Sequence, residues 1–372
     1  MSRLLKIVLV IVIIAVSLSG CSDRLSDMSV AQGVGIDKEN SGVTVSVQYL
    51  DLTKGNSTTD NLDKNITSVQ SQTASNPSRA LALMSGDLST PIFFGQNKVI
   101  VFGREYAEGE LNSIVQYALR TVDSRPDVLV AISSSKAQDI MKSSENKARV
   151  PAQDIYDLLK AGERSGLTCA VNVKDLQNHY MSKTADVFLP VLSVKNDKTR
   201  IDGIAVFSGS KPVKVLKNAD ALGFLLVNSR VKNASVVIND KSLGLIGVEL
   251  DYIRTKCRAE YRDSAVVFNC DIRFNVKINE SQRGSVVRLE ADDVKRIEAL
   301  AEKKIKRICT DAVSKCLKEK SDPFRLGMLL ARYDSDAYNF LCDDWKSNLP
   351  NAKVYVSTRA KASVVNASYT RR

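Results

Sequence analysis

The sequence predicts an α+β fold with two to three mixed α/β domains, and three features carry this prediction. Apolar residues occupy every second position from Val266 to Ile278, which is typical of a long strand in an antiparallel hairpin. A helical pattern follows from about Asp292 to Glu319, with an apolar residue every three or four positions. The first half of the chain instead alternates short strands and helices. Together these features predict an antiparallel sheet with a long C-terminal helix, and they disfavour a uniformly alternating α/β fold.

The first 20 residues have the layout of an export signal. Arg3 and Lys6 precede an apolar run from Ile7 to Val16 that is about half as long as the roughly 20 residues of a spanning helix. Leu18-Ser19-Gly20-Cys21 follows and resembles the bacterial lipobox, whose cysteine thiol receives a diacylglyceryl group and becomes the first mature residue. We therefore expect residues 1–20 to be a lipoprotein signal peptide and Cys21 to be the lipidation site. An uncleaved anchor helix and an ordinary signal with a chance cysteine are the alternatives.

The mature chain carries an excess of positive charge. Two of the 53 Lys and Arg residues lie in the signal, so 51 remain against 42 Asp and Glu, a net charge of about +9. Such an excess suits a surface close to anionic lipid headgroups. Nucleic acid is the alternative partner of a basic chain. The basic residues here are scattered among acidic ones, so we expect no nucleic acid partner.

The N-terminal region, residues 21–197, is predicted to be a mixed α/β region of one or two subdomains. A strand is expected at 43–49, where valines alternate with polar residues, and an exposed loop at 54–65, which is polar and rich in turn residues. Asn76-Pro77 has the composition of a helix start, with Asn as the cap and Pro in the first turn. Further strands are expected at 98–102 and 127–132, and helices at 78–84, 110–120, 151–160 and 174–181.

The C-terminal region, residues 198–372, is predicted to be an α+β domain with the long hairpin and helix. A strand at 201–207 and a helix at 218–227 precede the hairpin. With a turn at Arg262-Asp263, the predicted register places Ile253 opposite Ile272, Cys257 opposite Phe268, Ala259 opposite Val266 and Thr255 opposite Cys270. This register argues against a Cys257–Cys270 disulfide. Asp322-Pro323 predicts the start of another helix, and strands are expected around Val354–Val356 and at 363–368.

The remaining cysteines give no support for a metal site. Six follow Cys21, and none forms a C-x-x-C pair, so zinc-binding spacing is absent from the sequence. Scattered single cysteines are best interpreted as small buried hydrophobic residues. Because the chain is expected to be exported and the number of these cysteines is even, the sequence is compatible with disulfides but predicts no particular pair. We expect no metal and no cofactor.

The sequence also offers little for catalysis. His179 is the only histidine, and its neighbours suggest a surface or packing residue on an amphipathic helix. Gly33-Val34-Gly35 lacks the third glycine of a dinucleotide-binding fingerprint, and no P-loop is present. Trp345 is expected to pack in the core, and the basic run at 303–307 to be a solvated helix face rather than a lipid-facing patch. We therefore expect no catalytic residue.

Several ordered motifs together resemble a known family. They are Cys21-Ser22-Asp23, Gly33-Val34-Gly35-Ile36-Asp37, Lys98-Val99-Ile100-Val101-Phe102-Gly103, Arg120, Arg125, Val128-Leu129-Val130-Ala131, Asp202-Gly203-Ile204-Ala205-Val206-Phe207, Asp322-Pro323-Phe324 and Trp345. In this order the chain resembles the Ger(x)C family, the lipoprotein C subunits of spore germinant receptors. It departs from the family pattern at Ser22, which replaces a usual tryptophan, and at Gln96, near an expected histidine.

The resemblance implies a non-enzymatic lipoprotein subunit that supports receptor assembly and signalling in spore germination. Its implied partners are two integral membrane subunits, A and B, with the lipid anchor on the outer face of the spore inner membrane. No direct small-molecule ligand is expected, because nutrients would bind elsewhere in the receptor. The resemblance also implies a three-domain mixed α/β architecture.

Two other classes of protein remain as alternatives. A substrate-binding lipoprotein of an ABC-type transporter needs two doubly wound lobes with many parallel strands, and the predicted hairpin between Val248 and Ile278 counts against it. An exported enzyme is the third class.

Overall fold

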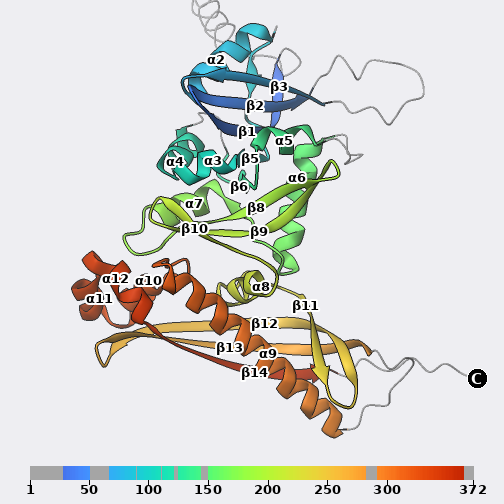
Figure 1. Ribbon diagram of the computed structural model, residues 1–372, viewed down its shortest axis with the longest axis vertical. Coiled ribbons are helices and arrows are strands. Elements are labelled where there is room, and N and C mark those ends of the chain that lie inside the picture. Colours follow the sequence, from blue (N-terminus) through green and yellow to red (C-terminus); the bar gives the residue numbers. More distant parts are fainter. Residues whose placement is uncertain are drawn as a thin grey trace, which may run out of the picture.

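The computed structural model describes residues 28–50, 67–88, 90–109, 111–120, 125–143, 150–281 and 291–363. The predicted signal peptide, Cys21, the polar loop at 54–65 and residues 364–368 lie outside these ranges. Within them the chain forms two β-sheets with helices on their faces and near the C-terminal end, which confirms the predicted α+β class (Figure 1).

The first sheet fills the upper half of the molecule in Figure 1. Its strands are β1 (Ser29–Glu39), β2 (Gly42–Leu50), β3 (Thr67–Ala74), β4 (Ile92–Phe93), β5 (Val99–Phe102), β6 (Leu129–Ser133), β7 (Val171–Asn172), β8 (Phe188–Lys195), β9 (Lys198–Ser208) and β10 (Lys211–Leu216). The main order is β10-β9-β8-β6-β5-β1-β2-β3, with β4 beside β1 and β7 beside β6. The central strands β8, β6, β5 and β1 are parallel, and antiparallel hairpins extend the sheet on both sides.

Helices cover both faces of the centre of this sheet. They are α2 (Pro77–Asp87), α3 (Arg104–Gly109), α4 (Leu111–Arg120), α5 (Ala137–Lys142), α6 (Pro151–Arg164) and α7 (Val173–Tyr180). Val99 and Val101 pack in the cluster that contains α5 and α6, whereas Ile100 and Phe102 pack in the cluster that contains α3, α4 and α7. A parallel strand buried on both faces is continuously apolar, which explains why β5 shows no alternation.

The second sheet contains the long hairpin and one parallel edge strand. Its strands are β11 (Ala234–Asp240), β12 (Gly244–Arg262), β13 (Ala265–Ser281) and β14 (Lys353–Ser363), in the order β11-β12-β13-β14. Helix α8 (Asn218–Val227) lies between the two sheets, and helix α9 (Ala291–Lys318) crosses one face of the second sheet (Figure 1). The apolar stripe of α9 is buried, including Ile297, Ile305 and Ile308. The predicted long helix is therefore confirmed.

The predicted hairpin exists, but its predicted register and turn are wrong. The turn residues are Asp263 and Ser264, with φ angles of 51° and 57°, so Arg262 pairs with Ala265. Thr255 consequently lies opposite Ile272, Ala259 opposite Phe268, and Cys257 opposite Cys270. The error is two residues, which keeps the same side chains on the buried face because side chains alternate with a period of two. Both cysteines are free thiols although they lie opposite each other.

Five short helical segments follow α9, and the first of them begins later than predicted. They are α10 (Leu326–Tyr333), α11 (Ser335–Leu341), the 3₁₀ turn Cys342–Asp344 and α12 (Trp345–Asn348), followed by the 3₁₀ turn Leu349–Asn351. Pro323 is not in the first turn of α10, because the helix begins only at Leu326. By contrast, the helix start predicted at Asn76-Pro77 is confirmed, since the Asn76 side chain accepts a hydrogen bond from the Arg79 N–H.

The two regions of the chain share one apolar core. The boundary proposed between residues 197 and 198 falls in the turn between β8 and β9. Because β9 pairs with β8 and β10 pairs with β9, both strands belong to the first sheet although they follow that boundary. One cluster of buried side chains runs from Ile36 and Val45 in the first sheet through Phe224 of α8 to Phe268 in the second sheet.

Candidate functional site

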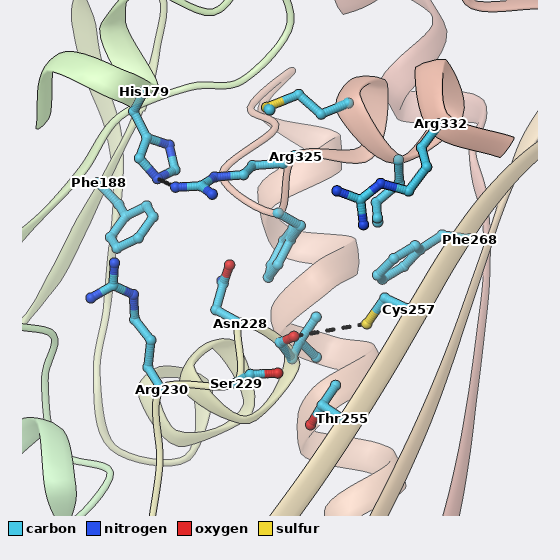
Figure 2. A pocket seen from close by; sticks show the side chains of 14 residues that line it. His179, Phe188, Asn228, Ser229, Arg230, Thr255, Cys257, Phe268, Arg325 and Arg332 are labelled. Carbon is cyan, nitrogen blue, oxygen red and sulfur yellow. Dashed lines mark hydrogen bonds between the residues drawn. The ribbon is translucent and has the colours of Figure 1, made fainter. Parts of the chain in front are cut away.

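A pocket of about 340 Å³ lies where the two sheets meet. Its walls come from the end of α7, the start of β8, the segment after α8, strands β12 and β13, and the start of α10 (Figure 2). The lining residues are His179, Phe188, Val227, Asn228, Ser229, Arg230, Thr255, Cys257, Phe268, Phe324, Arg325, Met328, Leu329 and Arg332. The pocket is thus built by segments that are far apart in the sequence.

Three arginines surround the open space of this pocket (Figure 2). Arg230 is paired outside the pocket lining, with its guanidinium nitrogens 2.8 Å from Glu163 and 3.2 Å from Asp175. It also lies over the Phe188 ring, 5.3 Å from the ring centroid. Arg325 is half-buried, and Arg332 is exposed at the rim on α10.

His179 is the hydrogen-bond partner of Arg325. The guanidinium Nη2 of Arg325 lies 2.8 Å from Nε2 of His179, and Nδ1 of His179 lies 3.1 Å from the carbonyl oxygen of Asp186. Because the guanidinium can only donate, Nε2 accepts and Nδ1 carries the proton. Burial, and secondly the positive charge of Arg325, lower the pKa of His179 to about 4. The imidazole is therefore neutral near pH 7.

The main chain at Arg325 is in the left-handed region, with a φ angle of 60°. This conformation is uncommon for a residue with a side chain and persists where surrounding contacts impose it. The contacts come from Asp322, whose carboxylate accepts hydrogen bonds from the Leu326 and Gly327 N–H groups at 2.9 and 3.1 Å. They hold the start of α10 and direct the Arg325 side chain towards His179 (Figure 2).

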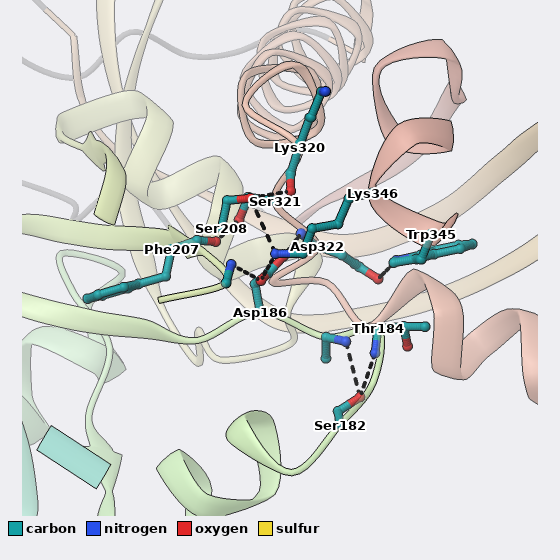
Figure 3. A network of polar contacts seen from close by, with 12 residues as sticks. Ser182, Thr184, Asp186, Phe207, Ser208, Lys320, Ser321, Asp322, Trp345 and Lys346 are labelled. Carbon is teal, nitrogen blue, oxygen red and sulfur yellow. Dashed lines mark hydrogen bonds and ion pairs between the residues drawn. The ribbon is translucent and has the colours of Figure 1, made fainter. Parts of the chain in front are cut away.

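Asp322 also belongs to a polar network that joins the two regions of the chain (Figure 3). Its carboxylate accepts a third hydrogen bond from the indole N–H of Trp345 at 3.0 Å. The main chains of Asp322 and Asp186 are hydrogen-bonded, and the Asp186 carboxylate accepts from the Asp322 N–H at 2.8 Å. Lys346 lies 2.9 Å from the other carboxylate oxygen of Asp186, which also accepts from the Gly209 N–H. Burial raises the pKa of Asp322 to about 7, opposed by the hydrogen bonds that favour its ionised form.

The residues singled out in the sequence are mostly structural where the structure describes them. His179 is buried at 3% exposure and packs edge-on against Phe188, in agreement with its interpretation as a packing residue. Trp345 is also buried, as expected. The six cysteines after Cys21 are all free, and burial raises the pKa of the Cys169 thiol to about 12. Cys21 lies outside the described residues, so its lipidation stays a prediction.

The glycines and the aspartate of the Gly33–Asp37 motif hold helices on the first sheet. A Cβ added to Gly35 would lie 3.0 Å from Met141 and 3.2 Å from Ala137, both on α5. The buried Asp37 carboxylate accepts from the N–H groups of Ala137 and Gln138, at 2.6 and 2.9 Å, and so caps the start of α5. This motif therefore has a packing role.

Within the described ranges, no group of three or more His, Cys, Asp or Glu side chains is arranged to hold a metal ion. In the same ranges, no helix is both long enough and apolar enough to cross a membrane. The arginines of the pocket carried no sequence signal, since residues 230, 325 and 332 share no motif and no spacing.

Comparisons with known proteins found matching family models, similar sequences and a similar structure. One family model, the N-terminal domain of spore germination proteins, matches residues 22–194, and a second, spore germination B3/GerAC-like, C-terminal, matches residues 202–363. The spore germination protein GerQC of Bacillus cereus is 23% identical over 321 residues, covering 85% of this chain and 88% of its own. YfkR of Bacillus subtilis strain 168, provisionally named a spore germination protein, is 20% identical over 362 residues, covering 92% of each chain. The crystal structure of the GerBC protein shares the fold, with a TM-score of 0.61 at 15% identity, covering 93% of this chain and all of that one.

Proposed function

The chain belongs to the Ger(x)C family of spore germination proteins, and we propose that it is a lipid-anchored, non-catalytic C subunit of a nutrient germinant receptor. The observation that carries the proposal is the order of features along the chain. The first family model begins at residue 22, directly after the lipobox cysteine Cys21, and the second ends at residue 363.

In this proposal the acyl chains on Cys21 hold the protein on the outer face of the spore inner membrane. Two or more acyl chains give stable anchoring, whereas one gives marginal binding. The net positive charge of the mature chain adds attraction to anionic headgroups.

The proposed partners are the integral membrane subunits A and B of the receptor. A scaffold of this kind places its binding energy in protein contacts, which typically bury about 1,200–2,000 Å² and depend on a few aromatic or arginine side chains. The transporter alternative requires two doubly wound lobes. The second sheet of this chain is instead an antiparallel hairpin with one strand on each side, so we do not favour that alternative.

Lipid attachment at Cys21 is tested by mass spectrometry of the mature N-terminus from spore membranes. We expect a diacylglyceryl-modified Cys21 as the first residue. Replacing Cys21 with Ala should release the protein from the membrane fraction and slow nutrient germination, because the acyl chains supply the membrane affinity. An unmodified Cys21, or an intact segment 1–20, would refute the anchoring part of the proposal.

The scaffold role is tested by two measurements on the receptor. Co-purification from detergent-solubilised spore membranes should recover subunits A and B with this chain, and deleting the chain should lower their levels or their activity. Calorimetry should detect no amino acid or sugar germinant bound by the isolated protein. A germinant bound at micromolar concentration would favour a substrate-binding lipoprotein instead.

A further inference from the structure

The pocket between the two sheets has a positive charge that its own lining does not balance. Among the described residues that line it are three arginines and no aspartate or glutamate. Arg230 is neutralised from outside the lining by Glu163 and Asp175. Arg325 and Arg332 have no ion pair at salt-bridge distance in the part of the chain that the structure describes.

Arg325 is only partly compensated. Its side-chain hydrogen bond goes to His179, whose neutral imidazole brings no negative charge. Burial and then the positive charge of Arg230 lower the pKa of Arg325, and they are opposed only by Asp175, whose carboxylate is itself paired with Arg230. A half-buried cation without a counterion in direct contact carries a desolvation cost, so an anion entering the pocket would be stabilised there. Guanidinium groups bind carboxylate and phosphate oxygens by paired, charge-assisted hydrogen bonds.

The pocket also offers an apolar surface. Met328, which is exposed, and Leu329, which is partly buried, line it above the almost fully buried rings of Phe188, Phe268 and Phe324. Its volume of about 340 Å³ is at the lower end of the range for small-molecule sites. Figure 2 shows the Phe188 and Phe268 rings and the three guanidinium groups around the same space. The arrangement fits a ligand with an anionic head and an apolar body about the size of one ring.

We propose that this pocket binds a small organic anion, with its carboxylate or phosphate group held by Arg325 and Arg332 and its apolar body against Met328 and Leu329. The proposed receptor role does not require this site, so the inference goes beyond that role. The site selects against zwitterionic amino acids, because an ammonium group would lie beside the same guanidinium groups. It also selects against neutral sugars, which leave the charge of Arg325 uncompensated.

Binding at this place would join the two regions of the chain more tightly. Arg325 directly precedes α10 and Arg332 lies in its last turn, whereas Arg230, which also lines the pocket, is paired with Glu163 of α6 and Asp175 of α7 on the first sheet. A ligand that contacts both sides binds the folded arrangement and not the unfolded chain, so it raises the unfolding temperature.

Titration calorimetry on the full-length protein in detergent at low salt tests the proposal with four probes. Benzoate and phenyl phosphate carry the two anionic heads, benzyl alcohol is the neutral counterpart, and phenylalanine is the zwitterion. We expect saturable binding of benzoate, of phenyl phosphate or of both, and the tighter of the two identifies the preferred head. Benzyl alcohol and phenylalanine should bind at least tenfold more weakly than the better anion.

Variants then assign the binding to the pocket. Arg325→Gln should weaken the better anion at least tenfold while its unfolding temperature without ligand stays equal to that of wild type or rises, because a half-buried charge is removed. Arg332→Gln changes an exposed side chain that cannot unfold the protein, and it should weaken the same anion about threefold or more. Arg125→Gln is the matched control, since Arg125 pairs with Asp127 and does not line the pocket, so its loss should leave binding unchanged.

Three results would overturn the proposal. They are the absence of saturable binding by both anions, wild-type affinity in the Arg325→Gln and Arg332→Gln variants, and equal affinity for benzyl alcohol. None of these results bears on lipid attachment at Cys21 or on co-purification with subunits A and B, so the two proposals fail separately.

Discussion

At the scale of single residues, His179, the one histidine of the sequence, is held in place by ring packing and by hydrogen bonds at both ring nitrogens. Its two ring nitrogens are used by Asp186 and Arg325, which belong to different regions of the chain. It therefore positions the Arg325 side chain at the pocket. The sequence could indicate a histidine on an amphipathic helix, but not these partners, because they are 7 and 146 residues away.

The neutral state of His179 predicts a pH dependence of stability. The folded pKa is about 4 and the ordinary value is 6.5, so the unfolded chain binds more protons between these pH values. The contribution to the free energy of unfolding is therefore complete above pH 6.5. It is lost as the pH falls towards 4, by at most about 1.4 kcal/mol per pH unit. The charged groups that act on the ring are Arg325, Arg230 and Asp175.

Urea unfolding at pH 7.5, 6 and 5 measures this dependence. The wild-type protein should lose more stability on acidification than His179→Gln, whose side chain does not titrate. Equal losses in the two proteins would show that His179 does not set the acid sensitivity.

At the scale of elements, the hairpin of β12 and β13 shows that a sequence pattern can predict which side chains face the core but not the register or the turn. Alternation has a period of two, so it specifies which side chains of β13 face the core. A slip of two residues keeps every buried face intact, so the pattern could not distinguish a turn at Arg262-Asp263 from one at Asp263-Ser264. Asp-Ser also lacks the strong turn signal of Asn-Gly. The long helix α9, of 28 residues, was predicted well because its apolar stripe runs from Ile297 to Leu317, over several turns.

The turn predicts a stabilising double substitution. Asp263 and Ser264 both have positive φ angles, as in the type I′ turn, which Asn-Gly prefers. Asp263→Asn combined with Ser264→Gly should raise the free energy of unfolding by about 1 kcal/mol, because Gly removes the Cβ strained at positive φ and Asn tolerates this region. Thermal unfolding followed by circular dichroism measures the gain. Ser264→Ala, which keeps the Cβ, is the control and should give none; a gain equal to that of the double variant would contradict the argument.

At the scale of the whole molecule, the pocket arises from packing that no local pattern encodes. Phe188, Phe224 and Phe324 lie in successive ring contacts, with centroids 5.0 and 5.3 Å apart, and Phe268 continues the series 6.4 Å from Phe324. These rings come from β8, α8, the segment before α10 and β13. The α+β class, the long hairpin and the long helix could therefore be predicted from the sequence, whereas the site formed where the two sheets meet could not.

The same contacts predict that the two regions unfold together. A continuous core and the buried network around Asp322 connect the two sheets, so calorimetry of the full-length protein should show a single transition, with calorimetric and van't Hoff enthalpies nearly equal.

Asp322→Ala leaves the Leu326, Gly327 and Trp345 N–H groups buried without an acceptor, which costs roughly 1–3 kcal/mol for each group. That total is a large share of the about 5–15 kcal/mol that stabilises a typical domain. The variant should therefore unfold at a much lower temperature or in two steps, whereas Asp127→Ala, which removes an exposed pair with Arg125, should behave as wild type. Two well-separated transitions in the wild-type protein would mean that the regions are energetically independent, and that the contacts at Asp322 only orient them.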